Sequence, residues 1–294
     1  MVSRVAVVDL NQDAAQSIGQ ALTLIGGIND LNVQKRNVVV KVGVFDPKSK
    51  HHSSVDVVGA IVKSFYKAPT VYLAESDNYR GTGSERLQIW KNLFSERVVP
   101  FNLSSDTDRR QVKIIGESVG LSHILFKPNA LVSTHILRTF EKGSVLKNLF
   151  GLIPDKKKAK YHHLTKSRGL GLEQAIMDVY EAVGGVDLAV LDGTRIALGV
   201  MPDSPTVDAN ILVVGRDAIA VEAVGFAALG YDPENIPVIK EAMNRGLGEG
   251  NVGKIQILGT PIEQLRGRFR PLLSTVKKSK KSSAKKKSFA KKGN

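Results

Sequence analysis

The chain contains no cysteine, and this single absence removes several classes of chemistry. A protein without thiols forms no disulfide, holds no thiolate-bound zinc or iron–sulfur cluster, and has no cysteine nucleophile. Uncharged apolar runs of the roughly 18 to 20 residues that cross a bilayer are also missing. The longest apolar stretch, Ile211 to Leu229, contains three charged residues, and the N-terminus lacks the apolar core of a secretory signal. These absences predict a cytoplasmic protein with no membrane partner and no iron–sulfur cofactor.

Acidic residues are absent beyond Glu263, and most of the net positive charge of the protein is concentrated there. The formal net charge is +14, and the segment after Glu263 contributes three arginines and nine lysines. Residues 1–263 therefore carry only 14 − 12 = +2. The lysines, serines and alanines from Lys277 onward do not supply enough apolar surface to fold. The sequence predicts a domain over residues 1–262 and a basic, lysine-rich, disordered tail over residues 263–294.

Short runs of β-branched residues alternate with helical segments along the first 262 residues. Continuous apolar runs of this kind are typical of parallel strands that are buried on both faces. A helix predicted at Ala218 to Leu229 has Asp217 as its N-cap and Gly230 as a left-handed stop. The alternation predicts an α/β fold with a mainly parallel central sheet and helices on both faces. The predicted strands are Val5 to Val8, Val38 to Val40, Thr70 to Leu73, Ala130 to Val132, Val186 to Leu191 and Ile211 to Val214, and further predicted helices are Asp13 to Ile25, Val55 to Tyr66, Glu85 to Phe94 and Leu172 to Ala182.

Two patterns resemble known site motifs but lack the context that those motifs need. Residues 248–253 match the glycine-rich G-x-G-x-x-G loop, which binds phosphate at the start of a following helix. The next segment, Ile255 to Leu258, has the composition of a strand, so a turn is the better interpretation. The histidine pairs His51–His52 and His162–His163 suggest a metal site. Neighbouring strand residues point to opposite faces, however, which favours solvated loop pairs.

Polar side chains follow several predicted strands at the point where each strand ends. Lys41, Glu75, His135 and Asp192 each follow such a strand in the sequence by one to three residues. In parallel sheets, ligands bind beyond the carboxyl ends of the strands, so we expect these four side chains to meet in one crevice. Residues 140–170 are predicted to form a long loop or insertion that closes over this crevice, because long loops in compact domains are often functional.

Several segments of the chain resemble a single protein family. They are Thr134–His135, the Lys147-Asn148-Leu149-Phe150-Gly151 block, Tyr161–His162 and residues 187–193 and 215–222, with Lys41, Ser53–Ser54 and Ala74–Glu75 in the N-terminal half. On these residues the chain is similar to the domain of unknown function 362 family, from about residue 35 to residue 260. Many members carry a ferredoxin-like iron–sulfur segment, which a chain without cysteine does not have. The resemblance implies that Thr134, Asn148 and His162 belong to a shared site.

These observations predict an enzyme or ligand-binding protein that acts on a small anionic molecule. Glu75, His135 and Asp192 are the candidate catalytic groups, and a divalent metal would have His135 and Asp192 as candidate ligands. The alternative is an accessory protein that docks on nucleic acid or another polyanion through its tail, because lysines neutralise phosphates without reading bases. A tail that only keeps the protein in solution is equally consistent with the charge run. The residues predicted to bind the anion are Lys41, Thr134, Lys147, Asn148, Lys157 and His162.

Overall fold

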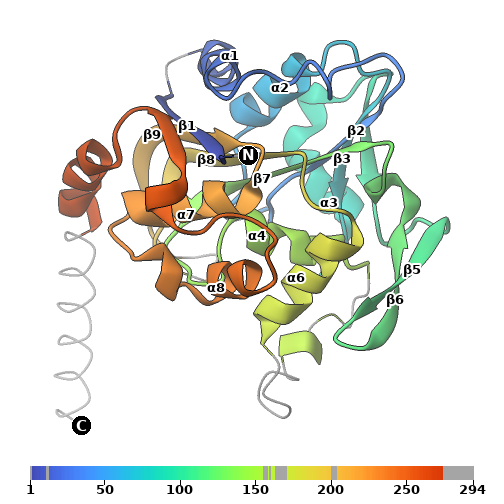
Figure 1. Ribbon diagram of the computed structural model, residues 1–294. Coiled ribbons are helices and arrows are strands. Elements are labelled where there is room, and N and C mark those ends of the chain that lie inside the picture. The colour runs from blue at the N-terminus through green and yellow to red at the C-terminus, as the bar shows by residue number, and fades with distance from the viewer. Residues whose placement is uncertain are drawn as a thin grey trace, which may run out of the picture.

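An eight-stranded sheet forms the centre of the protein in a computed structural model that describes residues 2–10, 13–154, 158, 160–162, 171–199 and 204–273. The strand order is β10-β1-β9-β8-β7-β2-β3-β4 (Figure 1). Neighbouring strands are parallel, except that β9 runs antiparallel to both β1 and β8. The predicted α/β fold with a mainly parallel sheet is therefore confirmed. The strands of this sheet are β1 Arg4–Asp9, β2 Val38–Lys41, β3 Val71–Glu75, β4 Val98–Asn102, β7 Ala130–Arg138, β8 Leu188–Ala197, β9 Thr206–Gly215 and β10 Gln256–Gly259.

Strand β9 differs in direction from the prediction, which placed Ile211 to Val214 among the parallel strands. β8 ends at Ala197 and β9 begins at Thr206, so a short connection joins the two strands. A connection of this length can link antiparallel neighbours, whereas a parallel pair needs a crossover of a dozen or more residues. The apolar composition of Ile211 to Val214 indicates burial on both faces, and it carries no information about direction.

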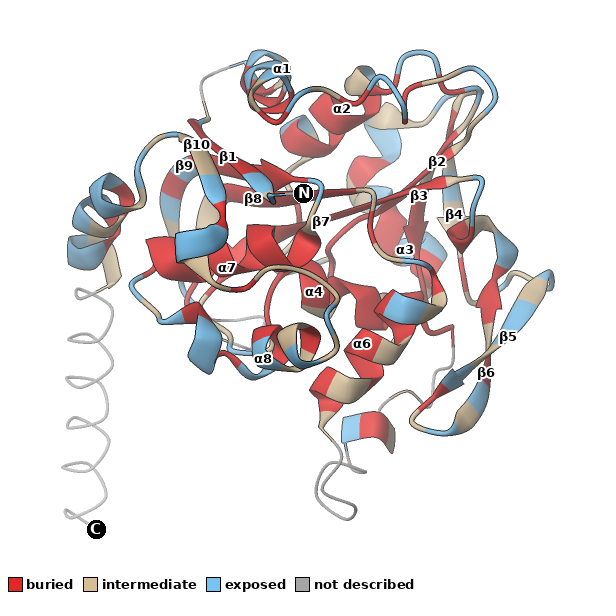
Figure 2. Cartoon of the chain, viewed as in Figure 1, coloured by how far each residue is buried: buried red, intermediate tan, exposed pale blue. Residues whose placement is uncertain are grey.

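Helices cover both faces of the sheet, and a hydrophobic cluster lies against each face (Figure 2). α1 and α2 pack on the face where Val38 and Val40 are buried. α4, α6, α7 and α8 belong to the opposite face, together with Val39. Side chains alternate along a strand, so consecutive valines of β2 enter different clusters, and both must be apolar. The helices are α1 Ala14–Leu24, α2 Val55–Ser64, α3 Gly83–Leu87, α4 Val145–Asn148, α6 Leu172–Ala182, α7 Ala218–Ala228 and α8 Pro237–Asn244, with short 3-10 segments η1 Gln88–Leu93, η2 His123–Leu125, η3 Leu149–Leu152, η5 Pro233–Asn235 and η6 Val252–Lys254.

The predicted ends of α7 and the predicted turn before β10 are both confirmed. The Asp217 carboxylate accepts hydrogen bonds from the backbone N–H groups of Ile219 (3.0 Å) and Ala220 (3.1 Å). Gly230 has a φ of +83°, the left-handed conformation that ends a helix. The glycine-rich residues 248–253 lead through the single turn η6 into β10, so this segment lacks the helix that a phosphate-binding loop needs.

Several segments contain more structure than the sequence predicted, including β4, α8 and the two segments that follow. A separate hairpin joins β5 (Arg109–Ile114) to β6 (Glu117–Ser122), and positive φ angles at Ile115 (49°) and Gly116 (75°) form its two-residue turn. The predicted loop at residues 140–170 contains α4 and η3, which are packed under the sheet by their buried leucines. A helical period is hard to recognise in such short segments, because they offer fewer than three turns.

The chain forms a helix over residues 262–273, although the sequence placed the start of the tail at residue 263. Leu265 and Phe269, which are four residues apart, are both buried. Arg268 adds a 2.6 Å ion pair to Asp9 of β1. The domain therefore extends past the predicted boundary, and the nine lysines of the predicted tail lie outside the described residues. Among the described residues, no helix has the length and apolar character needed to cross a membrane.

Candidate functional site

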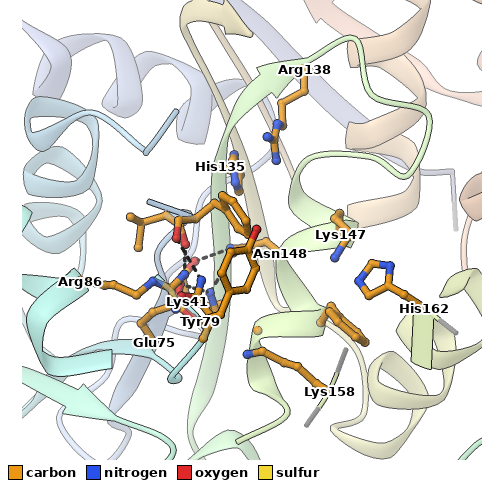
Figure 3. A pocket seen from close by; sticks show the side chains of 15 residues that line it. Lys41, Glu75, Tyr79, Arg86, His135, Arg138, Lys147, Asn148, Lys158 and His162 are labelled. Carbon is orange, nitrogen blue, oxygen red and sulfur yellow. Dashed lines mark hydrogen bonds and ion pairs between the residues drawn. The ribbon is translucent and has the colours of Figure 1, made fainter. Parts of the chain in front are cut away.

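A cavity of about 330 Å³ lies at the carboxyl ends of β2, β3 and β7 (Figure 3). Lys41 and Glu75 are the last residues of β2 and β3, and His135 lies near the end of β7. These three residues therefore meet at the edge where the sequence predicted a crevice. The loops and short helices that follow the strands supply the remaining walls. The lining residues are Lys41, Val44, Phe45, Glu75, Asn78, Tyr79, Arg86, His135, Arg138, Lys147, Asn148, Phe150, Gly151, Lys158 and His162.

The Lys41 ammonium uses all three of its N–H donors within the protein. Its Nζ donates to the Val42 carbonyl (2.9 Å), to Glu75 Oε2 (3.0 Å) and to Asn148 Oδ1 (2.8 Å). The Asn148 amide in turn donates to the carbonyl oxygens of Lys41 (2.8 Å) and Thr134 (3.1 Å). Asn148 thus ties α4 to both β2 and β7. Burial lowers the pKa of Lys41, and the Glu75 carboxylate partly offsets this shift.

The Glu75 carboxylate is shared by two cations. Its Oε2 atom lies 3.0 Å from Lys41 Nζ and 3.1 Å from Arg86 Nη2, and its Oε1 atom accepts the Ser76 backbone N–H at 2.8 Å. Arg86 also donates to the carbonyl oxygens of Ser76 and Val44. All of these side chains are buried. Glu75 therefore acts as the counterion that makes two buried cations tolerable, and the catalytic role predicted for it remains a prediction.

Gly151 allows η3 to pass directly over this ion cluster. A Cβ atom at this position would lie 2.6 Å from Lys41 Cε and 3.0 Å from Glu75 Oε1. A Cβ atom cannot lie as close as 2.6 Å to a non-bonded carbon, so Lys41 would have to move, and it is held by three hydrogen bonds. The last residue of the Lys-Asn-Leu-Phe-Gly block is therefore explained by close packing, while Asn148 of the same block holds the cluster in place.

His135 is buried, and its imidazole is neutral at neutral pH. Burial is the main cause that lowers its pKa well below the usual range, and the nearby charges of Arg138 and Lys41 lower it further. Its Nδ1 atom lies 3.2 Å from the Ile136 carbonyl. These surroundings disfavour the imidazolium. His135 offers a neutral hydrogen-bonding ring instead.

Lys147 and Lys158 bring two further ammonium groups to the cavity. Lys147 Nζ lies 4.3 Å from the centre of the Phe150 ring, and within the described part of the chain it has no hydrogen bond or carboxylate partner. Burial lowers the pKa of Lys147 to about 7, and the charges of Arg138, Lys158 and Lys41 add to the shift. Lys158 Nζ donates to Ser76 Oγ at 2.7 Å, and burial lowers its pKa to about 8 although Glu75 partly offsets the shift. Both lysines therefore titrate close to neutral pH.

Glu222 of α7 positions the segment that carries Lys147 and Asn148. Its carboxylate accepts the backbone N–H groups of Ser144 (2.8 Å) and Leu146 (2.9 Å) at the start of α4. Burial raises the pKa of Glu222 to about 7, although these hydrogen bonds favour the charged form. Glu222 also partly offsets the effect of burial on Arg138, whose pKa is lowered to about 10. A carboxylate on the helix behind the cavity therefore fixes residues at its wall.

Asp192 and Thr134 do not line the cavity, in contrast to the prediction. Asp192 pairs with Ile136 across β7 and β8, whereas His135 pairs with Leu191, so Asp192 and His135 point to opposite faces of the sheet. The Asp192 carboxylate accepts the Ser54 N–H (2.6 Å) at the start of α2 and the Thr194 N–H (2.9 Å). Its observed contacts are those of a residue that anchors α2. Thr134 contributes its backbone carbonyl to Asn148, and its side chain is buried outside the cavity.

The structure also bears on His162, on the pair His51–His52 and on the predicted metal site. His162 lines the cavity, with its ring edge-on to Phe150 at 5.4 Å, while Lys157 lies outside the described residues. The pair His51–His52 is not a solvated loop, because His51 is buried with Nε2 at 2.8 Å from the Ser204 carbonyl. Of the residues that the structure describes, no group of three His, Asp or Glu side chains is placed to hold a metal ion. The metal site proposed for His135 and Asp192 therefore finds no support in their positions.

Several lining residues were not predicted as site residues from the sequence, and the ones with ionisable side chains are Tyr79, Arg86, Arg138 and Lys158. The sequence does contain an indication for Arg138. Ile136 and Leu137 are apolar residues that extend β7 beyond its predicted end at Val132, as far as Arg138. Arg86 lies on α3, and the sequence pattern of this helix does not indicate that Arg86 contacts Glu75 at the end of β3. Loop packing alone brings Tyr79 and Lys158 to the cavity.

A family model described as Domain of unknown function (DUF362) matches residues 38–227, which is well over half of the chain. The matched span begins with β2 and ends within α7. It includes every residue that lines the cavity and also Glu222. No curated protein matches the chain. The protein is a member of the Domain of unknown function (DUF362) family.

Proposed function

We propose that the protein binds a small anionic molecule in the cavity at the carboxyl ends of β2, β3 and β7, as a ligand-binding protein or an enzyme. The observation that carries this proposal is the charge of the lining. Five cationic side chains line the cavity, Lys41, Arg86, Arg138, Lys147 and Lys158, against a single carboxylate, Glu75, among the described lining residues. The difference in formal charge is 5 − 1 = +4 when every lysine is protonated.

Two lysines remain to face a ligand after the internal ion pairs are counted. Glu75 already serves Lys41 and Arg86, and every donor of Lys41 is used. Lys147 has no charged partner in the described part of the chain, and Lys158 has only a hydroxyl and a carbonyl as acceptors. Burial is the main cause of the lowered pKa of both lysines; cationic neighbours lower that of Lys147 further, and Glu75 only partly offsets the shift of Lys158. A bound anion would supply countercharge in a partly desolvated place, where charge-assisted hydrogen bonds are strong.

The same groups identify what the cavity contributes to chemistry. Lys147, with a pKa of about 7, can gain or lose a proton near neutral pH, as a general acid or base must. The neutral imidazole of His135 can accept or donate one hydrogen bond. Glu75 is a weaker candidate than the sequence suggested, because both of its oxygens are already engaged. Acid–base work at this site is therefore assigned to Lys147, with His135 orienting the ligand.

Replacing Lys147 by glutamine is expected to weaken anion binding about tenfold to a hundredfold, the loss of one charge-assisted hydrogen bond of about 1.5–3 kcal/mol. Binding of sulfate, phosphate and small carboxylates is measured by calorimetry and by ligand-dependent thermal shift. Lys160→Gln is the matched control. Lys160 also places its ammonium over a ring, 5.0 Å from the centre of Tyr161, but it pairs with Glu117 and does not line the cavity.

Equal losses in the Lys147→Gln and Lys160→Gln variants would mean that the anion responds only to net charge and would refute the cavity as the site. Absence of any anion-dependent shift in the unmodified protein would refute the proposal as a whole.

The lysine-rich tail supports a second candidate function, docking on nucleic acid or another polyanion. Its support is the sequence itself, with nine lysines and no acidic residue after Glu263. Residues 274–294 lie outside the described residues, so this candidate rests on charge alone. Binding of this kind weakens steeply as salt is raised, because counterions are released from the phosphates. Equal DNA affinity with and without residues 275–294 would contradict it. The cytoplasmic location predicted from the sequence stays a prediction.

A further inference from the structure

Aromatic rings line the cavity on two sides, in addition to the cations. Phe45 and Tyr79 pack edge-to-face, with ring centres 5.4 Å apart. Phe150 and His162 form a second edge-to-face pair, also at 5.4 Å. In Figure 3 the Tyr79 ring lies beside the Lys41–Glu75 cluster, and His162 lies on the other side of the view with Lys147. The charged floor is thus flanked by two aromatic pairs.

Tyr79 is unusual among the aromatic residues because 76% of its surface is exposed although it lines a cavity. Large apolar side chains that are this exposed are rare in the described part of the chain, and the others are Val2 and Tyr66. An exposed ring beside a cavity offers apolar surface that a bound molecule can cover. Burial of a tyrosine ring against a second ring is favourable beyond the area that is removed from water.

The loops that carry Phe45 and Tyr79 are fastened to each other before any ligand binds. Asn78 Nδ2 donates to the Phe45 carbonyl at 3.0 Å, and Arg80 lies 3.8 Å from the Asp46 carboxylate. Arg86 reaches from α3 to the Val44 carbonyl. The aromatic pair is therefore held in place over the ends of β2 and β3, which lowers the entropy lost when a ligand is ordered against it.

We infer that the ligand is a planar aromatic ring that carries a phosphate or a carboxylate. The anionic group contacts Lys147 and Lys158, and the ring stacks against Tyr79 with Phe45 behind it. A cavity of about 330 Å³ is at the small end of ligand sites and suits one ring system with one charged group. This inference rests on the proposed anion-binding function and adds the class of molecule to it.

The test compares flat and puckered rings that carry the same charged group. Phenyl phosphate is measured against cyclohexyl phosphate, and benzoate against cyclohexanecarboxylate, by calorimetry on the full chain. We expect the flat ring to bind about tenfold more tightly in at least one of the two pairs, as stacking of a ring on an aromatic side chain implies. The pair that shows the preference identifies the charged group.

Tyr79→Ala is expected to bring the ratio of flat to puckered affinity close to one. Tyr66→Ala is the matched control, because Tyr66 is 66% exposed and has the ammonium of the next residue, Lys67, over its ring, as Tyr79 has Arg80. Tyr66 does not line the cavity, so its variant keeps the ratio of the unmodified protein. Equal affinities for flat and puckered rings in both pairs, or a preference that survives Tyr79→Ala, would overturn the inference. Binding of inorganic phosphate or sulfate without any ring preference would leave the proposed function standing, whereas binding of no anion would remove both.

Discussion

Replacing Glu75 by glutamine is expected to lower the free energy of unfolding by about 3–5 kcal/mol, the usual cost of removing one partner from a buried ion pair. Among the described residues, Lys41 and Arg86 would then have no carboxylate partner, and the side chain of Lys41 is only 1% exposed. Glutamine keeps the size of the side chain but removes the negative charge. The expected loss therefore comes from uncompensated positive charge rather than from a packing defect. Chemical denaturation of the two proteins at the same pH measures the difference.

Two further variants separate the effect of charge from other causes. Glu117→Gln removes a carboxylate from a half-exposed pair with Lys160 and should cost no more than about 1 kcal/mol, as surface pairs do. The double variant Lys41→Met with Glu75→Gln removes both charges of the buried pair, so it should be less destabilised than the sum of the single variants. Strict additivity, or a loss at Glu75 no larger than that at Glu117, would contradict the role of Glu75 as a buried counterion.

The positions of β1, β2, β3, β7, β8 and β9 were predictable because burial on both faces requires continuous apolar runs. The predicted strands Val38 to Val40 and Ala130 to Val132 lie within the observed strands β2 and β7. The edge of the sheet that holds the site was predictable as well, since Lys41 and His135 follow or end such runs. Strand direction was not predictable for β9, because an apolar run has the same composition in either direction.

The face on which each site residue lies could not be predicted from the sequence. His135 and Asp192 both stand at the end of a strand, and a one-residue difference in register decides which face each side chain reaches. That register is set by the pairing of β7 with β8, which depends on the packing of both faces at once. Glu222 and Arg86 were missed for a related reason, because each reaches the site from a helix that packs there only in three dimensions.

The affinity of the cavity for an anion is expected to fall as the pH rises above about 7, because Lys147 and Lys158 lose their protons in the empty protein. Their pKa values are about 7 and about 8, lowered mainly by burial. A bound anion favours the charged forms and raises both values. Above the pKa of the empty state, binding must therefore take up a proton for each lysine that has lost one. Lys147 loses its proton first. Above its pKa, the uptake of this one proton lowers the affinity about tenfold for each pH unit.

The stability of the empty protein changes with pH in the opposite direction. Lys147 has a lower pKa in the folded protein than its ordinary value of 10.5, so the unfolded chain binds more protons between about pH 7 and pH 10.5. The contribution of Lys147 to stability therefore rises with pH across this window and is lost as pH falls through 7. Glu222 has a folded pKa of about 7, above its ordinary value of 4.5, so its contribution is lost as pH rises from 4.5 to 7. Weaker anion binding at pH 9 would accordingly not reflect loss of the fold.

Sulfate is the appropriate probe for the pH dependence because its charge stays constant over this range. Calorimetry at pH 8 in buffers of different ionisation enthalpy should show an uptake of about 1.4 protons per sulfate, about 0.9 at Lys147 and about 0.5 at Lys158, and almost none at pH 6. In Lys147→Gln the decline in affinity should begin nearer pH 8, since only Lys158 then titrates in this range. Lys160→Gln, which leaves both cavity lysines in place, should reproduce the profile of the unmodified protein. A sulfate affinity that is constant from pH 6 to pH 9 would show that neither lysine changes its protonation on binding, and the anion would then have to be held by Arg138 and by groups outside the cavity.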